Sequence, residues 1–498
     1  MFALLLFLAL SITVEHVRGC WMLRHRLNQL KAQGEVLSSE ALRPKAMLPQ
    51  DNAALDLLSM SNRLGTVMSN LDITPLTLRF SSPGQAIVVW QMEHWSLDGK
   101  TTNDWNQVGV ELNKSADLLE QLKEVIEKPG YDTEFDYQTG FVDFKMAPVG
   151  PVRNAARLLS AAAMHELARG QLEPANGHLC SLVRLGALQK PEPLIIYQLI
   201  RQACAAIAFN ATWQAVQADG WKDSQLRSLQ SAWQRCDFIT DMARAMEMER
   251  ALSLEYFEQI KHSRSTLRSV IAQHEQVAEA TDGGMGGLVT RGFMLHWIHA
   301  PVWRIAWADQ GALFDLNEWQ VIIERERIAR TNGWVVLADR SKALSLNIPW
   351  APFLEGSQNI SFYDKLRLLF AEENLGISEG IIRKTLFMQA QQQMAVAAIA
   401  IDRYRLKTGH LPVTLSDLVP DYLPALPQDF MNGRPLRYRL SPADDFILYS
   451  VGEDGNDDGG DRALRKANGK YTRIWDGKDA VWPIRATSEA AARALSSP

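Results

Sequence analysis

An unbroken apolar run at the N-terminus constrains this chain more than any other feature. Residues 2–14 read FALLLFLALSITV and contain no charged side chain. A helix that crosses a bilayer needs about 20 predominantly apolar residues, and Val17 extends this run only past Glu15 and His16. The run is still too apolar for an ordinary surface helix. We therefore expect residues 1–19 to form a single-pass signal anchor or transmembrane helix.

Other interpretations of the N-terminus stay open. The run also suits a cleaved signal peptide, although no basic residue precedes it unless the true start lies upstream. Lipoprotein processing at Cys20 is a third interpretation, with Arg18 standing where a small apolar residue is expected. A buried core helix is the fourth. Four basic residues between positions 18 and 31 follow the run, which by the positive-inside rule favours a cytoplasmic body.

Length and composition indicate a globular chain of more than one domain. A length of 498 residues exceeds one ordinary core, and 47% apolar with 22% charged residues is typical of folded proteins. The net charge of -5 gives no reason to expect a nucleic-acid partner. Four cysteines without C-x-x-C spacing predict buried thiols and not a disulfide framework. Their pairing in an oxidising compartment stays open.

The sequence pattern predicts a mainly α fold with a small α+β unit at its end. We expect a membrane-proximal helix and mixed segment over 20–110, a helical body over 111–345 and a linker over 346–377. An α+β domain over 378–485 and a disordered tail over 486–498 complete the chain. Gly170 and Ala175 have the spacing of the tight turn and the small packing residue of a tetratricopeptide-like helical hairpin. No 34-residue period repeats, so the body is predicted to contain stacked hairpins.

Local signals are strongest in the C-terminal unit. A helix over 378–407 is predicted to end at Gly409 in a left-handed cap. Thr414 and Asp417 have the spacing of a capping box for a short helix that follows. Residues 435–440 and 446–451 alternate in the manner of two strands joined by a tight turn. The unit is therefore predicted to pack a long helix beside an antiparallel hairpin.

An acidic, glycine-rich loop follows this hairpin, and we call residues 453–461 the acidic loop. Asp454, Asn456, Asp458 and Gly459 fit the first half of a calcium loop, D-x-[DN]-x-[DN]-G. Calcium takes six to eight oxygen ligands, which closely spaced carboxylates and amides supply. Arg465 stands where an EF-hand has its bidentate glutamate, so the other ligands must come from Asp461, backbone carbonyls or water. A solvated acidic turn is the competing interpretation, and another metal is a third.

The run AIDRYRLKTGHLPVTLSDLVP, with the two strands and the acidic loop, resembles the globular domain of the major pseudopilin of type II secretion systems. The resemblance covers roughly the last fifth of the chain. It implies a long helix on a small antiparallel sheet and a calcium ion that stabilises the unit. The implied metal-ligating residues are Glu453, Asp454, Asn456, Asp457, Asp458 and Asp461. Here about 360 residues separate this unit from the N-terminal run, and no prepilin peptidase motif is present.

The whole chain is similar to a family of uncharacterised bacterial envelope proteins with a membrane anchor, a helical body and a pseudopilin-like tail. We expect a structural or partner-binding protein of the bacterial cytoplasmic membrane with protein partners and without enzymatic activity. Its body is expected on the periplasmic side, where calcium is millimolar. A component of a type II secretion or pilus-like machinery is one alternative. An envelope hydrolase is another. His296 and His299 are spaced to share one face of a helix, where ordinary packing or an interfacial role is expected and zinc ligation is the alternative.

Overall fold

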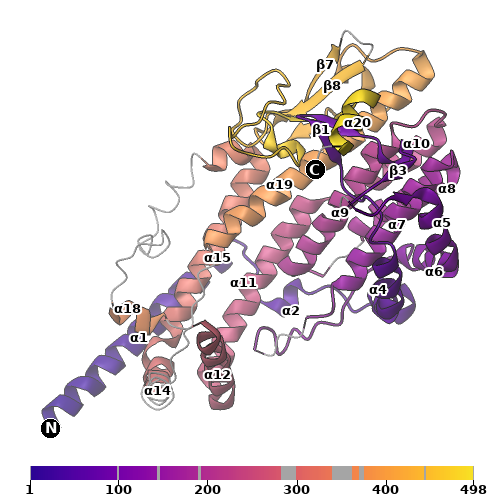
Figure 1. Ribbon diagram of the computed structural model, residues 1–498. Helices are drawn as coiled ribbons and strands as arrows, with labels where there is room; N and C mark the ends of the chain where they lie inside the picture. The colour runs from indigo at the N-terminus through magenta and orange to yellow at the C-terminus, as the bar shows by residue number, and fades with distance from the viewer. Residues whose placement is uncertain are drawn as a thin grey trace.

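The computed structural model describes residues 2–97, 100–142, 146–188, 192–281, 299–338, 362–368, 375–441 and 445–496. The fold is mainly helical with a few small sheets. Figure 1 shows an elongated molecule in which the N-terminal helix projects from one end and the strands β7 and β8 lie at the other. The predicted mainly α fold with one N-terminal apolar helix is confirmed.

The elements follow the chain in three groups. The N-terminal group is α1 (Phe2–Ala32), α2 (Ser39–Leu42), α3 (Ala53–Ser59), α4 (Ser61–Asn70), β1 (Arg79–Ser82), β2 (Gln85–Ile87), β3 (His94–Trp95), β4 (Asn103–Asp104), α5 (Trp105–Lys114) and α6 (Ala116–Ile126). The body is α7 (Gly150–Ala168), α8 (Leu172–Gly186), α9 (Ile195–Ala215), α10 (Asp223–Gln234), α11 (Phe238–His262), α12 (Arg264–Thr281), α14 (Ala300–Val302), the π-helical turn η4 (Trp303–Trp307) and α15 (Ala308–Asn332). The last group is α18 (Phe362–Arg367), α19 (Leu375–Thr408), the 3₁₀ turn η5 (Leu415–Leu418), β5 (Gln428–Asp429), β6 (Arg434–Pro435), β7 (Arg437–Ser441), β8 (Asp445–Ser450), β9 (Ala480–Val481), β10 (Ile484–Arg485) and α20 (Ser488–Ser496).

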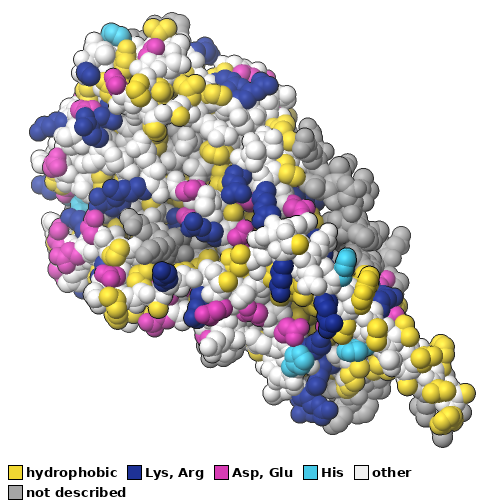
Figure 2. Space-filling view, turned by 180° about the vertical axis from the view of Figure 1, so that it is seen from behind, with side chains coloured by type: hydrophobic (Ala, Val, Ile, Leu, Met, Phe, Trp, Pro, Cys, Tyr) yellow, Lys and Arg dark blue, Asp and Glu magenta, His cyan; other side chains and the backbone are white. Residues whose placement is uncertain are grey.

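Helix α1 is continuous across the boundary at residue 19 that the sequence suggested, and its two halves lie in different surroundings. Near the N-terminus the apolar side chains are exposed, with Phe2 at 81% and Phe7 at 69%. Figure 2 shows this apolar end projecting beyond the body, with basic and histidine side chains gathered near its base. Farther along, Leu23 and Leu30 are buried in a core with α11, α12 and α15. By length and composition, α1 contains the candidate membrane span of the described residues.

In the body, α8 packs against both α7 before it and α9 after it. Gly170 has a φ of 70° and forms the turn between α7 and α8, as its spacing predicted, and Ala175 is fully buried behind it. Gly186 lets α8 approach α9 closely, because a Cβ at this position would lie 3.3 Å from that of Ala205. The predicted helical hairpin is therefore present. Its relation to tetratricopeptide repeats stays a prediction.

Helix α19 differs most from expectation, because it is the central helix of the body as well as the first element of the C-terminal unit. Its middle is apolar on every side, and residues 394–401 are all buried. A helix that is apolar all round is stable only when other elements enclose it. Its glutamines also serve the body: Gln389 accepts a hydrogen bond from the backbone N–H of Phe238 at 2.9 Å, and Gln392 donates to the Trp233 carbonyl at 2.8 Å.

These contacts place the break between α10 and α11 against α19. One hydrophobic cluster runs from Ala53 to Trp482 and includes α19. Residues 378–485 therefore share their core with the helical body and do not form a separately packed domain. Of the predicted linker, only α18 and the start of α19 lie within the described residues.

The strands confirm the predicted hairpin and add two long-range connections. Strand β8 pairs antiparallel with β7 and β9, with Tyr438 opposite Leu448. Strands β1 and β2 also form an antiparallel pair, and β10 adds to β2 in parallel, which joins the chain's end to its N-terminal group. Helix α20 occupies most of the expected disordered tail. Its moderately amphipathic sequence, rich in alanine, explains why helix forms there.

Candidate functional site

The acidic loop leaves the end of β8 at the surface of the C-terminal unit, and its first carboxylate is held by two arginines. Glu453 forms ion pairs with Arg383 of α19 and with Arg465. Burial alone would raise the pKa of Glu453, but the charges and hydrogen bonds of these arginines outweigh it and lower that pKa. Glu453 is therefore a structural anion that ties the loop to α19.

Two further carboxylates of the acidic loop are neutralised within the C-terminal unit. Asp457 accepts hydrogen bonds from Arg437 Nε and from the Tyr449 hydroxyl, both at 2.9 Å. Asp461 accepts one from Lys478 Nζ at 2.9 Å. Each of these three predicted ligands, counting Glu453, thus has a protein cation as its partner in this conformation.

The remaining predicted ligands are turned toward solvent. Asp454 accepts a hydrogen bond from the backbone N–H of Asn456 at 3.1 Å, which makes a local turn. Asp454, Asn456 and Asp458 are all exposed. Within the part of the chain that the structure describes, no three acidic side chains of the loop bring their oxygens within 4.8 Å of one another. The loop is therefore acidic and ordered by turns, but its carboxylates do not converge on one point.

The structure adds a residue that sequence reasoning missed, Asp479, which stands directly before β9. Its side chain is fully buried beneath the acidic loop. One oxygen, Oδ2, accepts a hydrogen bond from the backbone N–H of Gly460 at 2.7 Å. The other, Oδ1, is buried without a hydrogen-bond partner of good geometry among the described residues. Burial and the neighbouring carboxylates of Asp458 and Asp457 raise the pKa of Asp479 to about 6.

A buried carboxylate oxygen without a well-aligned donor is costly, because it has lost water and gained little from the nearby backbone N–H of Asp458. A cation above it would remove that cost. Calcium bound there would take oxygens from Asp458 and Asp479, with backbone carbonyls and water completing its shell. No sequence motif marks Asp479, which lies 18 residues beyond Asp461. Only the pairing of β8 with β9 brings it under the loop.

The acidic loop also contacts the helical body, and we call this contact the C-terminal junction. Gly455, with a φ of 73°, lies against Val335, and a Cβ at position 455 would clash with that side chain. Trp334 donates its backbone N–H to Phe430 O at 3.1 Å, and the guanidinium of Arg383 lies 5.9 Å from the Trp334 ring centre. The acidic loop is thus placed where the body and the C-terminal unit meet.

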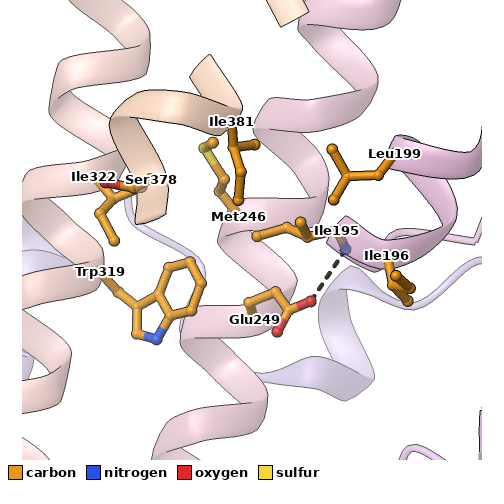
Figure 3. A pocket seen from close by; sticks show the side chains of 9 residues that line it. All are labelled: Ile195, Ile196, Leu199, Met246, Glu249, Trp319, Ile322, Ser378 and Ile381. Atoms are coloured by element: carbon orange, nitrogen blue, oxygen red, sulfur yellow. Dashed lines mark hydrogen bonds between the residues drawn. The ribbon is translucent and has the colours of Figure 1, made fainter. Parts of the chain in front are cut away.

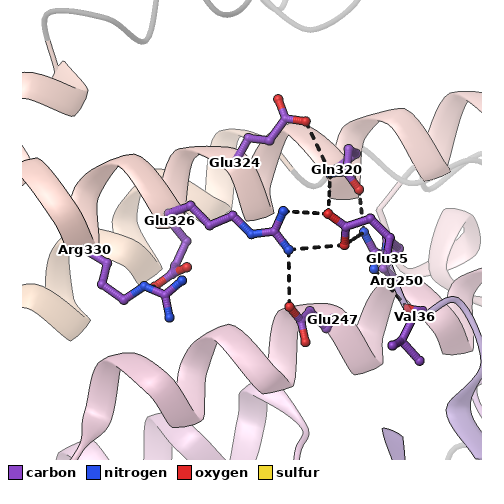
Figure 4. A network of polar contacts seen from close by, with 9 residues as sticks. Glu35, Val36, Glu247, Arg250, Gln320, Glu324, Glu326 and Arg330 are labelled. Atoms are coloured by element: carbon purple, nitrogen blue, oxygen red, sulfur yellow. Dashed lines mark hydrogen bonds and ion pairs between the residues drawn. The ribbon is translucent and has the colours of Figure 1, made fainter. Parts of the chain in front are cut away.

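A second polar cluster holds helix α1 to the body, and we call it the anchor clamp (Figure 4). Glu35 follows α1 and accepts hydrogen bonds from Arg327 at 2.5 and 3.1 Å and from the fully buried Arg250 at 3.0 Å. Burial would raise the pKa of Glu35, but these arginines lower it to about 2. Glu35 therefore stays ionised at any physiological pH and fixes the end of α1 between α11 and α15.

An apolar cavity of about 240 Å³ lies between α9, α11, α15 and α19 (Figure 3). Its lining residues are Ile195, Ile196, Leu199, Met246, Glu249, Trp319, Ile322, Ser378 and Ile381. Glu249 accepts a hydrogen bond from the backbone N–H of Ile195 at 3.0 Å and so caps the start of α9. His299 does not line this cavity, and His296 lies outside the described residues. The cavity gives the envelope-hydrolase alternative no histidine next to a carboxylate among its lining residues.

The cysteines are thiols, as the sequence predicted. All four lie within the described residues and are free, with Cys180, Cys204 and Cys236 buried and Cys20 half-buried on α1.

In comparisons with known proteins, the chain matches no protein-family model, no curated protein and no solved structure. The site is therefore interpreted from the geometry of this chain.

Proposed function

We propose that this chain is a single-pass protein of the bacterial cytoplasmic membrane whose helical body has a structural or partner-binding role. The observation that carries the proposal is the division of α1. Its first half exposes large apolar side chains, such as Leu6 at 62% and Leu10 at 61%, whereas Leu30 is fully buried in the body. An exposed apolar helix is unstable in water and stable in lipid.

The contacts of α1 near residue 16 favour an uncleaved anchor over a cleaved signal peptide. His16 bonds to the Ile305 carbonyl at 2.7 Å, and Gln310 donates to Glu15 Oε2 at 2.8 Å. A peptidase that cut before residue 20 would remove both contacts from the folded body. The interpretation as an anchor thus explains why residues at the end of the apolar run have specific partners in α15 and η4.

We further propose that the body is periplasmic and that calcium stabilises the C-terminal junction. Asp479 supports this, because its buried Oδ1, which no hydrogen bond of good geometry satisfies, lies beneath a loop rich in carboxylates. Binding to the folded state alone stabilises a protein by mass action, about 2.7 kcal/mol when the ligand is at 100 times its Kd. Extracellular calcium modules have dissociation constants on the order of 10⁻⁴–10⁻³ M, which suits millimolar periplasmic calcium and not cytoplasmic calcium.

The resemblance to pseudopilins supports a second, narrower candidate, a component of secretion machinery. Helix α19, the Gly409 cap with φ 80° and the sheet order β7-β8-β9 agree with the helix-and-sheet plan that this resemblance implies. Helices α9, α10, α11 and α15 already enclose α19. We therefore favour a role in which the C-terminal unit contacts partners from a fixed position on the body.

Membrane topology tests the proposed function directly. Alkaline phosphatase fused after residue 498 should be active in cells, because the enzyme folds only outside the cytoplasm. A green fluorescent protein fusion at the same point should be dark, because it should be exported in the same way as the phosphatase fusion. Extraction with alkaline carbonate should leave both fusions in the membrane. A fluorescent fusion with inactive phosphatase would place the body in the cytoplasm. Release by carbonate would contradict the anchor.

A further inference from the structure

A cluster of three metal-ligating side chains lies where α1 meets the body, outside the acidic loop, the anchor clamp and the apolar cavity. His16 and Cys20 stand four residues apart on α1 and therefore share one face of that helix. Asp309, the second residue of α15, faces them and is only 6% exposed. Their ligand atoms all lie within 4.8 Å of one another.

The hydrogen bonds of the cluster orient the side chains as ligands. His16 Nδ1 lies 2.7 Å from the Ile305 carbonyl, which can only accept, so Nδ1 carries the proton and the Nε2 lone pair faces Cys20. Lys261 Nζ holds Asp309 Oδ1 at 2.5 Å and leaves Oδ2 directed at Cys20. Such outer partners, a backbone carbonyl on the histidine and a donor on the carboxylate, are typical of metal sites in proteins.

The distances suit a tetrahedral ion. With a metal–sulfur bond of about 2.3 Å and a metal–nitrogen bond of about 2.0 Å, ligand atoms lie about 3.5 Å apart. Cys20 Sγ is 3.7 Å from His16 Nε2 and 2.8 Å from Asp309 Oδ2, to which the thiol donates a hydrogen bond. Replacing that proton by a metal ion requires the sulfur and oxygen to separate by under about 1 Å.

The backbone around the cluster is shaped to bring the two helices together. The turn η4 is π-helical, and such turns are common at functional sites. Ile305 lies within it. Gly19 permits the close approach of α1, because a Cβ there would lie 3.0 Å from the Gln310 side chain.

We propose that His16, Cys20 and Asp309 bind one zinc-class divalent ion, with water as the fourth ligand. The ion takes the place of the thiol proton, which leaves to solvent, and the resulting thiolate, the imidazole and the carboxylate each donate one electron pair. One set of ligands comes from the anchor and the other from the body. The ion therefore ties α1 to α15 at residues 16–20, whereas the anchor clamp holds α1 near its C-terminal end.

The test uses the full chain, reduced, stripped of metal and held in detergent, with Co²⁺ as the spectroscopic probe. We expect one Co²⁺ per chain with a thiolate-to-cobalt charge-transfer band, which Zn²⁺ abolishes by displacement. Cys20→Ser should lose the band, and Asp309→Asn should weaken binding at least tenfold. Lys261→Met, which alters only the outer partner, should weaken it about tenfold. Cys180→Ser is the matched control, because that thiol lies among Asn176 and Ser228, and it should keep the band.

A second measurement needs no substitution and so does not depend on the folding of any variant. Zn²⁺ should protect Cys20 of the wild-type chain from alkylation, mapped by mass spectrometry, and a chelator should remove the protection. Equal alkylation under both conditions, a band that survives in Cys20→Ser, or a Cys20 that carries lipid would overturn the proposal. The band reports on sulfur alone, so it is independent of calcium at the acidic loop and of membrane topology.

Discussion

The backbone N–H of Gly460 donates to Asp479 Oδ2 at 2.7 Å and so places a buried carboxylate directly beneath the acidic loop. This contact joins a residue of the loop to one that stands 19 positions later, across the β8–β9 pairing. It changes the expected calcium site. The loop alone was expected to supply the ligands, whereas the structure pairs three of its carboxylates with cations and adds Asp479 from below.

Replacing Asp479 by Asn should stabilise the calcium-free chain at neutral pH. The pKa of Asp479 is raised from 3.8 to about 6, so the folded state binds more protons than the unfolded state between these values. Its ionisation therefore costs stability as pH rises from about 4 to 6. In chelator we expect Asp479→Asn to match the wild type near pH 4 and to exceed it by about 1 kcal/mol at pH 7. Thermal unfolding across this range measures the difference, and a constant offset would contradict it.

Removing the anchor clamp should destabilise the junction of α1 with the body. Glu35→Gln leaves the fully buried guanidinium of Arg250 without its counter-ion, which costs about 3 kcal/mol. Because the pKa of Glu35 is lowered to about 2, its contribution is present above about pH 4.5 and is lost as pH falls toward 2. Urea unfolding at pH 7 measures the loss. Lys114→Met, which breaks an exposed pair with Glu111, is the control and should change little.

Charges on the projecting end of α1 should release the protein from the membrane. Leu8 and Leu10 are 55% and 61% exposed, and an arginine at each costs about 3 kcal/mol in a bilayer. We expect Leu8→Arg with Leu10→Arg to move the chain into the carbonate-soluble fraction. Val413→Arg, at an equally apolar and 71% exposed position on the C-terminal unit, should leave it in the pellet. Identical fractionation of the two variants would mean that α1 is no anchor.

Substitutions at two glycines of the acidic loop distinguish the cost of backbone strain from the cost of a packing clash at the C-terminal junction. Gly455 and Gly459 have nearly equal φ values of 73° and 72°, but only Gly455 lies against Val335. Alanine strains the backbone at both positions and clashes only at 455. Gly455→Ala should therefore be less stable than Gly459→Ala by about 1–3 kcal/mol, as denaturant unfolding would measure. Equal losses of unfolding free energy in the two variants would show that the acidic loop does not pack against the body.

Local features of the C-terminal unit could be predicted because their causes lie within a few residues. Gly409 caps α19 with a φ of 80°, and Asp417 accepts hydrogen bonds from the backbone N–H groups of Val413 and Thr414. The strand pair followed in the same way from alternation and a turn. The capping residues and the turn chemistry act without help from the rest of the fold.

Long-range placement could not be read in the same way. His16 and Asp309 are 293 positions apart in the sequence, and no spacing rule connects them. The role of α19 was signalled, however, by the run AVAAIAI at 395–401. A helix that packs only on a small sheet has one apolar face and one polar face. This run has no polar face, which indicates that other elements enclose it on all sides.

Thermal unfolding of the full chain in detergent, with millimolar calcium and then with excess chelator, tests the central claim most directly. A calcium-locked C-terminal junction predicts a higher Tm in calcium for the wild type, and no calcium-dependent rise for Asp458→Asn or Asp479→Asn. Magnesium at the same concentration should have a smaller effect, since it demands an octahedral shell at shorter distances. An unchanged Tm in the wild type, or an equal rise in the Asp479→Asn variant, would contradict the account and leave the acidic loop a solvated turn.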